Sequence, residues 1–224
     1  MKEEKKLLKN NILLKKDKGS LNLSFVLLYS AVFTVMALIL FSDFFFGEQS
    51  FVRRGDAFTQ HYKALIYFAR YVKECFSTVF VGHSFVFPQF DFEIGLGSDI
   101  LTTFSYYSFG DPFYIFAFMV PEEYMHLYYE AAVVLRFYFT GLSFSYLCFA
   151  TGKKNKLAVV AGSIAYCFSA YALYSGMKHP FFMNPMVFLP LIVVGVEKII
   201  KGKRPYLLVS AVALSEISNY YFFY

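Results

Sequence analysis

The 224 residues contain no tryptophan and only three cysteines. Cys75, Cys148 and Cys167 have no metal-ligand spacing and form no disulfide framework. Cys148 and Cys167 lie in apolar runs, where cysteine is a small hydrophobic residue. The sequence also lacks a low-complexity linker, a short-period repeat and any segment typical of a soluble domain. These absences exclude a cysteine-based metal site and a small disulfide-stabilised fold.

Charged residues are also few, at 17% of the chain, whereas 58% of the residues are hydrophobic and 22% aromatic. This composition is typical of proteins that cross a membrane several times. The net charge of +5 is then a sign of topology, because Lys and Arg in short loops stay on the cytoplasmic side. We therefore expect an all-α integral membrane protein with no nucleic-acid partner.

The order of apolar and polar segments predicts a multi-pass bundle in the cell membrane with a cytoplasmic amino terminus. Residues 1–20 are rich in lysine and lack a signal-cleavage pattern, so we expect a basic cytoplasmic tail. Further basic clusters follow residues 150 and 200, in agreement with this orientation. The chain stops inside an apolar run, which predicts the amino-terminal part of a longer protein. The expected spans are 21–46, 124–150, 157–174, 186–200 and 206–224, with outer loops at 47–112 and 175–185 and a re-entrant or interfacial helix at 113–120.

The first outer loop holds the residue types best suited to chemistry. It is long and too aromatic for a disordered segment, and its first part has the apolar spacing of a helix from Asp56 to Phe76. At the start of that helix, Asp56 is suited to act as a general base towards a hydroxyl, or as a metal ligand. The preceding Arg53 and Arg54 are suited to hold a phosphate. An N-cap role for Asp56 is the alternative, and the two roles are compatible.

Other ionisable residues are weaker candidates. Asp99, in a Gly-x-Gly-Ser-Asp stretch, and Asp111, before a proline, also fit ordinary turns. Glu130 and Arg136 fall within an expected span, where charged groups are costly and usually functional, although a structural ion pair is the alternative. These two residues are too widely spaced to pair on one helix, so each is expected to have a partner in the outer loop or on another helix.

The second outer loop contains Lys178 and His179, on the same expected side as Asp56. A single histidine is more often structural than catalytic, but this position makes it a candidate contact for a phosphate or an acceptor.

Several short motifs in a fixed order carry a family resemblance. They are Gly55-Asp56 with Gln60 and Tyr62; Gly95-Leu96-Gly97-Ser98-Asp99; Tyr106-Tyr107; Asp111-Pro112-Phe113; Arg136 with Thr140-Gly141-Leu142 and Tyr146; Ala165-Tyr166 with Phe168-Ser169; His179-Pro180; Leu189-Pro190-Leu191; and Asn219-Tyr220-Tyr221. In this combination the chain resembles the YfhO-type bacterial membrane proteins, which are placed with the GT-C fold of glycosyltransferases. The resemblance spans nearly all of residues 20–224. Similar loops usually carry a tryptophan before the Gly-x-Gly stretch, where this chain has Phe90 and Phe92.

The resemblance implies an enzyme that transfers a sugar from a polyprenyl-phosphate carrier lipid to a cell-envelope polymer, such as lipoteichoic or wall teichoic acid, on the outer membrane face. It places the essential carboxylate at Asp56, with Asp99 or Asp111 as a second one. A divalent metal is compatible with these residues but is not required by the sequence. The expected substrate contacts are Arg53, Arg54, Gln60, His61, Arg136, Lys178 and His179.

A non-enzymatic membrane protein, either a carrier-lipid transporter or an assembly scaffold, is the alternative function. In that case Glu130 and Arg136 are expected to line a path through the membrane. An unrelated ion or solute transporter fits less well, because transporters concentrate their polar residues near the middle of the membrane rather than in a large loop.

Overall fold

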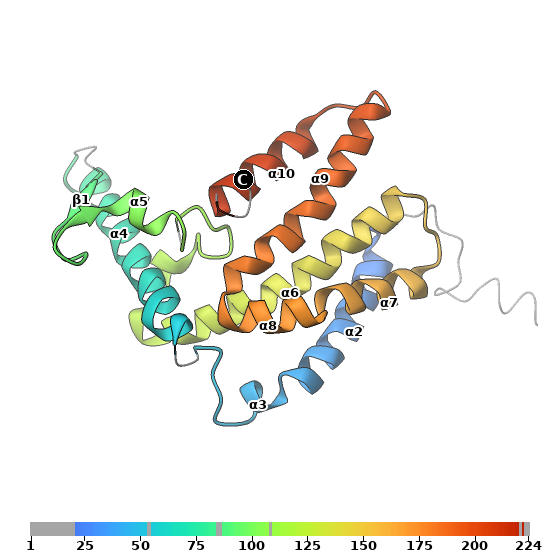
Figure 1. Cartoon of the computed structure of the whole chain (residues 1–224), viewed down its shortest axis with the longest axis horizontal. Coiled ribbons are helices and arrows are strands. Elements are labelled where there is room, and N and C mark those ends of the chain that lie inside the picture. Colours follow the sequence, from blue (N-terminus) through green and yellow to red (C-terminus); the bar gives the residue numbers. More distant parts are fainter. Residues whose placement is uncertain (1–20, 53–54, 84–86, 108, 220, 222–224) are drawn as a thin grey trace, which may run out of the picture.

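The computed structural model describes residues 21–52, 55–83, 87–107, 109–219 and 221. These residues form a helical bundle with a smaller helical and looped segment at one side of it (Figure 1). The elements are α2 (Leu23–Leu40), α3 (Ser42–Phe45), η1 (Ala57–Tyr62), α4 (Lys63–Phe80), β1 (Phe90–Asp91), β2 (Ser98–Asp99), α5 (Ile100–Phe104), η2 (Ala117–Met119), η3 (Glu122–Tyr124), α6 (Met125–Ala150), α7 (Lys156–Cys167), α8 (Ala170–Lys178), η4 (Pro180–Met183), α9 (Asn184–Ile200) and α10 (Tyr206–Ser218).

Within the described residues, three helical segments are long and apolar enough to cross a membrane: 23–40, 122–150 and 180–200. The bent pair α7 and α8 passes the same test when it is counted as one span. The lipid-facing character of α2 is visible on its surface, where Leu27, Val35 and Ile39 are all more than half exposed. The all-α membrane class expected from the composition is confirmed.

Helix α6 is the centre of the bundle and packs against α2, α7 and α9. The hydroxyl of Tyr29 in α2 donates to the carbonyl of Tyr138 in α6 at 2.8 Å. Gly141 allows α6 to approach α7, since a Cβ there would lie 3.1 Å from the Ser163 carbonyl oxygen. The hydroxyls of Ser145 and Ser163 form a further hydrogen bond of 2.7 Å between α6 and α7. Small and hydroxyl-bearing residues at these crossings are typical of helix packing in membranes.

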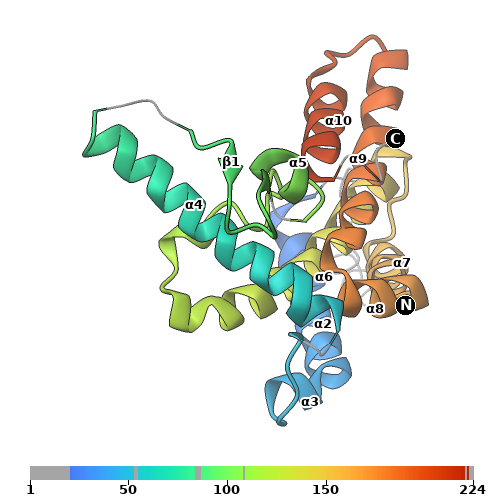
Figure 2. The same cartoon turned by 60° about the vertical axis from the view of Figure 1, so that its left-hand side comes forward.

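The segment from η1 to η3 forms the side lobe of the molecule, in which α4 extends away from the bundle (Figure 2). The short strands β1 and β2 pair in antiparallel register, with Phe90 opposite Asp99. Arg70 of α4 forms a two-pronged contact with Glu122 at the entry to α6, with nitrogen–oxygen distances of 3.0 and 2.6 Å. Thus α4 is linked to the start of the central helix, and η1, which precedes α4, lies beside the bundle.

Two segments differ from the expected helices. The segment 157–174 is not one straight helix, because α7 ends at Cys167 and α8 begins at Ala170 with a bend of 46°. Ser169 causes the new start by capping α8, with its hydroxyl oxygen 3.4 Å from the Ala172 backbone nitrogen. In the segment 113–120, turns and the short 3-10 helix η2 replace the expected half-helix, and the extended backbone of Val120 ends it.

Candidate functional site

The candidate site begins at Gly55, directly before the helical turn η1. Its φ of 98° lies in the left-handed region that favours glycine, and its carbonyl accepts hydrogen bonds from the backbone of Phe58 and Thr59 at 3.1 and 2.9 Å. The turn that follows is π-helical, a rare conformation that is frequent at functional sites. As a result Asp56 is exposed, whereas His61, on the same turn, is buried.

Two side chains, Gln60 and His179, contact Asp56, and Tyr107 in turn contacts Gln60. Its Oδ1 accepts a hydrogen bond of 2.8 Å from Gln60, whose own Oε1 accepts one of 3.0 Å from the Tyr107 hydroxyl. Its Oδ2 lies 3.7 Å from Nε2 of His179. The carboxylate makes no capping bond to the helix that follows, so the N-cap alternative does not describe its contacts. The Asp56 side chain remains 52% exposed and is therefore open to a ligand.

His61 and His179 form the buried side of the site. Although they are 118 residues apart, Nε2 of His61 lies 2.7 Å from Nδ1 of His179. The ring of Phe181 packs edge-on against His61, with centroids 4.9 Å apart. Nδ1 of His61 is buried and has no hydrogen-bond partner among the described residues. A carboxylate and two imidazoles thus form a connected row from the surface to the interior.

The electrostatic environment keeps both imidazoles neutral near pH 7. Burial lowers the pKa of His61 to about 3, with smaller contributions from His179 and the positive charge of Arg136. Burial also lowers the pKa of His179, against the opposing effect of the Asp56 carboxylate. A neutral imidazole carries one donor and one acceptor nitrogen, so His179 can be oriented by contacts with His61 and Asp56, whereas His61 makes one such contact, to His179.

Asp56 and His179 face a cavity of about 400 Å³ at this end of the bundle. Lys178 brings a positive charge to the same cavity, and its Nζ donates to the Tyr174 hydroxyl at 2.8 Å. The site therefore combines a carboxylate, an ammonium group and an aromatic ring around one space. The residues that line it are Gly55, Asp56, Ala57, Tyr174, Ser175, Lys178, His179 and Phe182.

Comparison with known proteins identifies the family. The sequence matches the model of the family described as "Bacterial membrane protein YfhO" over residues 27–224. The chain belongs to the YfhO family. A curated relative, "Uncharacterized protein YfhO" of Bacillus subtilis (strain 168), is 38% identical over 71 residues, which are 32% of this chain and 8% of the relative. The match thus covers a small part of the relative's length. No solved structure matches the chain.

A second polar centre in this YfhO-family chain lies inside the bundle. Arg136 is fully buried and its Nη2 donates to Oδ2 of Asp111 at 2.6 Å. Asn184 contacts both partners, at 3.2 Å from each. The guanidinium also lies 4.5 Å from the centre of the Tyr114 ring. The partner expected for Arg136 outside its own helix is therefore Asp111, and the contacts of this pair are those of an internal ion pair rather than of an open substrate site.

The other candidates of the YfhO-family chain lie apart from the cavity. Asp99 caps α5, with its Oδ1 accepting the Thr102 backbone N–H at 2.6 Å. Glu130 has a partner in the first loop, as expected, because it accepts a hydrogen bond of 2.6 Å from the Ser50 hydroxyl. Arg53 and Arg54 lie outside the described residues. Of the ten candidates, the structure brings together Asp56, Gln60, His61, Lys178 and His179.

Sequence reasoning missed three residues that support the polar sites: Tyr107, Tyr174 and Asn184. Tyr107 was noted as part of a family motif and Tyr174 was not singled out, and Asn184 stands between Met183 and Pro185, where it resembles an ordinary loop residue. A signal for Asn184 was its place at the entrance to an apolar span, where a polar side chain needs a partner. Among the described residues, no group of three or more His, Cys, Asp or Glu side chains is arranged to hold a metal ion.

Proposed function

We propose that this YfhO-family protein is a membrane glycosyltransferase, which transfers a sugar from a polyprenyl-phosphate carrier to a hydroxyl of a cell-envelope polymer. The supporting observation is the meeting of Asp56 and Lys178 at one cavity, on a pair of segments far apart in the sequence. A carboxylate suits the activation of a hydroxyl acceptor, and an ammonium group suits the neutralisation of a leaving phosphate. Lipoteichoic or wall teichoic acid is the proposed acceptor class.

The proposed orientation places this cavity on the extracytoplasmic side. The opposite end of the bundle carries the cationic loop residues Lys153, Lys154, Lys201, Lys203 and Arg204. Positive loops are retained in the cytoplasm, so the end that holds Asp56 faces outwards and the amino terminus lies inside. A carrier lipid with its phosphate at the outer surface would present the sugar at the level of the cavity.

In the proposed reaction, Asp56 accepts the proton of the acceptor hydroxyl while that oxygen attacks the anomeric carbon of the sugar. The bond between the anomeric carbon and the phosphate oxygen breaks, and polyprenyl phosphate leaves with the electron pair. Lys178 balances the charge of this phosphate. Arg53 and Arg54, which precede Gly55-Asp56 in the sequence, are proposed as further phosphate contacts.

The two histidines are proposed to position Asp56 rather than to exchange protons with substrate. If Nε2–H of neutral His179 points at Asp56, then its Nδ1 accepts the Nε2–H of His61. This arrangement leaves Nδ1 of His61 without a proton, in agreement with its buried position. Because burial disfavours protonation of His61, the direction of donation, from His61 to His179 and from His179 to Asp56, stays the same across the neutral pH range.

The non-enzymatic alternative has less support. A transport path lined by Arg136 needs this side chain to be accessible, yet it is fully buried between Asp111 and Asn184. Glu130, the other residue expected along such a path, accepts a hydrogen bond from the Ser50 hydroxyl of the first loop.

The test uses the full-length protein in liposomes with a radiolabelled polyprenyl-phosphate sugar and a teichoic-acid acceptor. We expect Asp56→Asn to lower the rate of sugar transfer by about 100-fold or more, as for loss of a general base. Asp43→Asn is the matched control, because Asp43 lies near the same end of the bundle but outside the cavity. Wild-type rates for Asp56→Asn would remove this carboxylate from the mechanism. If the wild type moves the lipid between leaflets without forming product, the transporter alternative replaces the enzyme.

A further inference from the structure

A second cavity lies at the opposite end of the bundle from Asp56, where α6 and α9 end. Its volume is about 370 Å³, within the range of roughly 300–1,000 Å³ for small-molecule sites. Helix α9 connects the two ends: it begins five residues after His179, and its last turns carry Val194, Glu197 and Lys198 of the second cavity. Its 17 residues make it roughly 26 Å long, close to the hydrocarbon thickness of about 30 Å. The second cavity therefore lies at the level of the other membrane surface.

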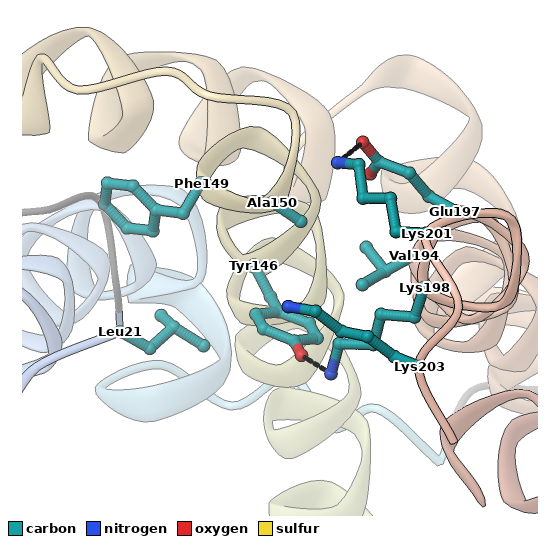
Figure 3. A pocket seen from close by; sticks show the side chains of 9 residues that line it. All are labelled: Leu21, Tyr146, Phe149, Ala150, Val194, Glu197, Lys198, Lys201 and Lys203. Carbon is teal, nitrogen blue, oxygen red and sulfur yellow. Dashed lines mark hydrogen bonds and ion pairs between the residues drawn. The ribbon is translucent and has the colours of Figure 1, made fainter. Parts of the chain in front are cut away.

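Three lysines surround this cavity, as Figure 3 shows: Lys198, Lys201 and Lys203. Lys201 pairs with Glu197, so its charge is balanced locally. Nζ of Lys198 donates to the Tyr146 hydroxyl at 2.6 Å. This bond holds the ammonium group at the cavity wall, and its other N–H groups remain able to donate to a ligand. Nζ of Lys203 has no ion-pair partner among the described residues. The cavity thus carries a net positive charge from two lysines.

The remaining wall is apolar and comes from the membrane-crossing helices and the residues beside them. Leu21 precedes α2, Phe149 lies at the end of α6, and Val194 is on α9. A free anion in water gains nothing from such a wall, because only the charged rim attracts it. A molecule with a phosphate at one end and an acyl chain at the other gains from both. The arrangement therefore favours a lipid over a soluble anion.

We propose that this cavity binds the phosphate group of an anionic membrane phospholipid. Lys198 and Lys203 contact the phosphate, and the apolar wall contacts the upper part of an acyl chain. A zwitterionic lipid binds less well, because its own cation meets the two lysines. The proposal concerns the end of the bundle away from Asp56 and does not depend on the sugar-transfer chemistry.

The experiment measures lipid retained by the full-length protein in detergent, by native mass spectrometry, with phosphatidylglycerol or phosphatidylcholine as probe. We expect the wild type to retain phosphatidylglycerol in preference to phosphatidylcholine. The Lys198→Gln/Lys203→Gln variant should bind phosphatidylglycerol about 25-fold more weakly, since each lysine near an anionic lipid contributes about fivefold. Lys198→Arg/Lys203→Arg, which keeps both charges, should retain binding and shows that substitution here does not unfold the protein.

Lys153→Gln/Lys154→Gln is the matched control, because both residues lie at the same end of the bundle but outside the cavity. An equal loss in this control would overturn the proposal by showing general surface charge. Equal retention of phosphatidylcholine would also overturn it. Inorganic phosphate is the third probe: if it displaces phosphatidylglycerol at equal concentration, the site takes a soluble phosphate and the lipid assignment fails.

Discussion

Removal of the Arg136 charge should strongly destabilise the protein. Arg136→Met keeps much of the side-chain volume but leaves Asp111, which is 1% exposed, without its counter-ion. Asp111 would keep hydrogen bonds from the Phe113 backbone at 2.9 Å and from Asn184 at 3.2 Å. These two bonds do not neutralise a buried charge. We therefore expect a loss of about 3–5 kcal/mol in the free energy of unfolding, which is typical when one partner of a buried pair is removed.

A second substitution removes the Asp111 charge that Arg136→Met leaves without a counter-ion. Asp111→Asn in the Arg136→Met background keeps an oxygen for the Phe113 N–H but carries no charge. Because replacing both charges of a buried pair is often nearly neutral, the double variant should regain most of the stability lost in Arg136→Met. Arg70→Met is the control, since the Arg70–Glu122 pair is exposed and its loss should cost less than about 1 kcal/mol.

Unfolding is followed by the loss of helical circular dichroism in detergent, with the same protein concentration for all variants. For Arg136→Met we expect a fall in the Tm on the order of 10 °C. The reasoning is refuted if Arg136→Met is no less stable than Arg70→Met, or if the added Asp111→Asn substitution restores nothing. Either result would mean that the Asp111 carboxylate is not a buried ionised group.

Three further predictions concern single residues. The pKa of His61 is about 3 in the folded chain and 6.5 ordinarily, so between these pH values the unfolded chain binds a proton that the folded chain does not. The contribution of His61 to stability is therefore complete above pH 6.5 and falls by up to about 1.4 kcal/mol per pH unit on acidification. Denaturation midpoints measured against pH should show a flatter profile for His61→Asn. Asp99→Ala should lose about 1 kcal/mol of stability, because the α5 cap is lost, whereas Asp99→Asn should keep both stability and sugar transfer. A stable Asp99→Asn variant without sugar transfer would return Asp99 to the catalytic candidates. Gly195→Ala should cost about 1–3 kcal/mol of stability, because the added Cβ would lie 2.8 Å from the α10 backbone. Gly162→Ala should be tolerated, because the nearest atom to its added Cβ would be 3.6 Å away. Equal thermal stability of the two variants would refute the close approach of α9 and α10.

The sequence predicted the all-α membrane class, because long apolar runs are a local signal. It also predicted a partner for Arg136 outside its helix, since a charge within a span needs one. It did not identify Asp111 as that partner. Asp111 precedes a proline in a segment rich in turn signals, and local spacing contains no information on which loop residue reaches the bundle interior.

The contact between His61 and His179 was also beyond local reasoning. Each histidine taken alone fits a structural residue, and only the packing of η1 against the end of α8 brings them within 2.7 Å. The bend between α7 and α8 had a weak local signal in Ser169, a residue type that caps helices. The continuous apolar character of 157–174 concealed it. The assembled site thus depends on tertiary contacts between two loops, although most of its residues were individually recognisable.

The most direct measurement of the central claim is a double-mutant cycle on sugar transfer by the full-length protein, using Asp56→Asn, His179→Asn and the combined variant. If the two residues act as one unit, the combined variant should lose little more activity than Asp56→Asn alone. Losses that multiply, with folding intact in all variants, would contradict a shared site and separate His179 from the function of Asp56.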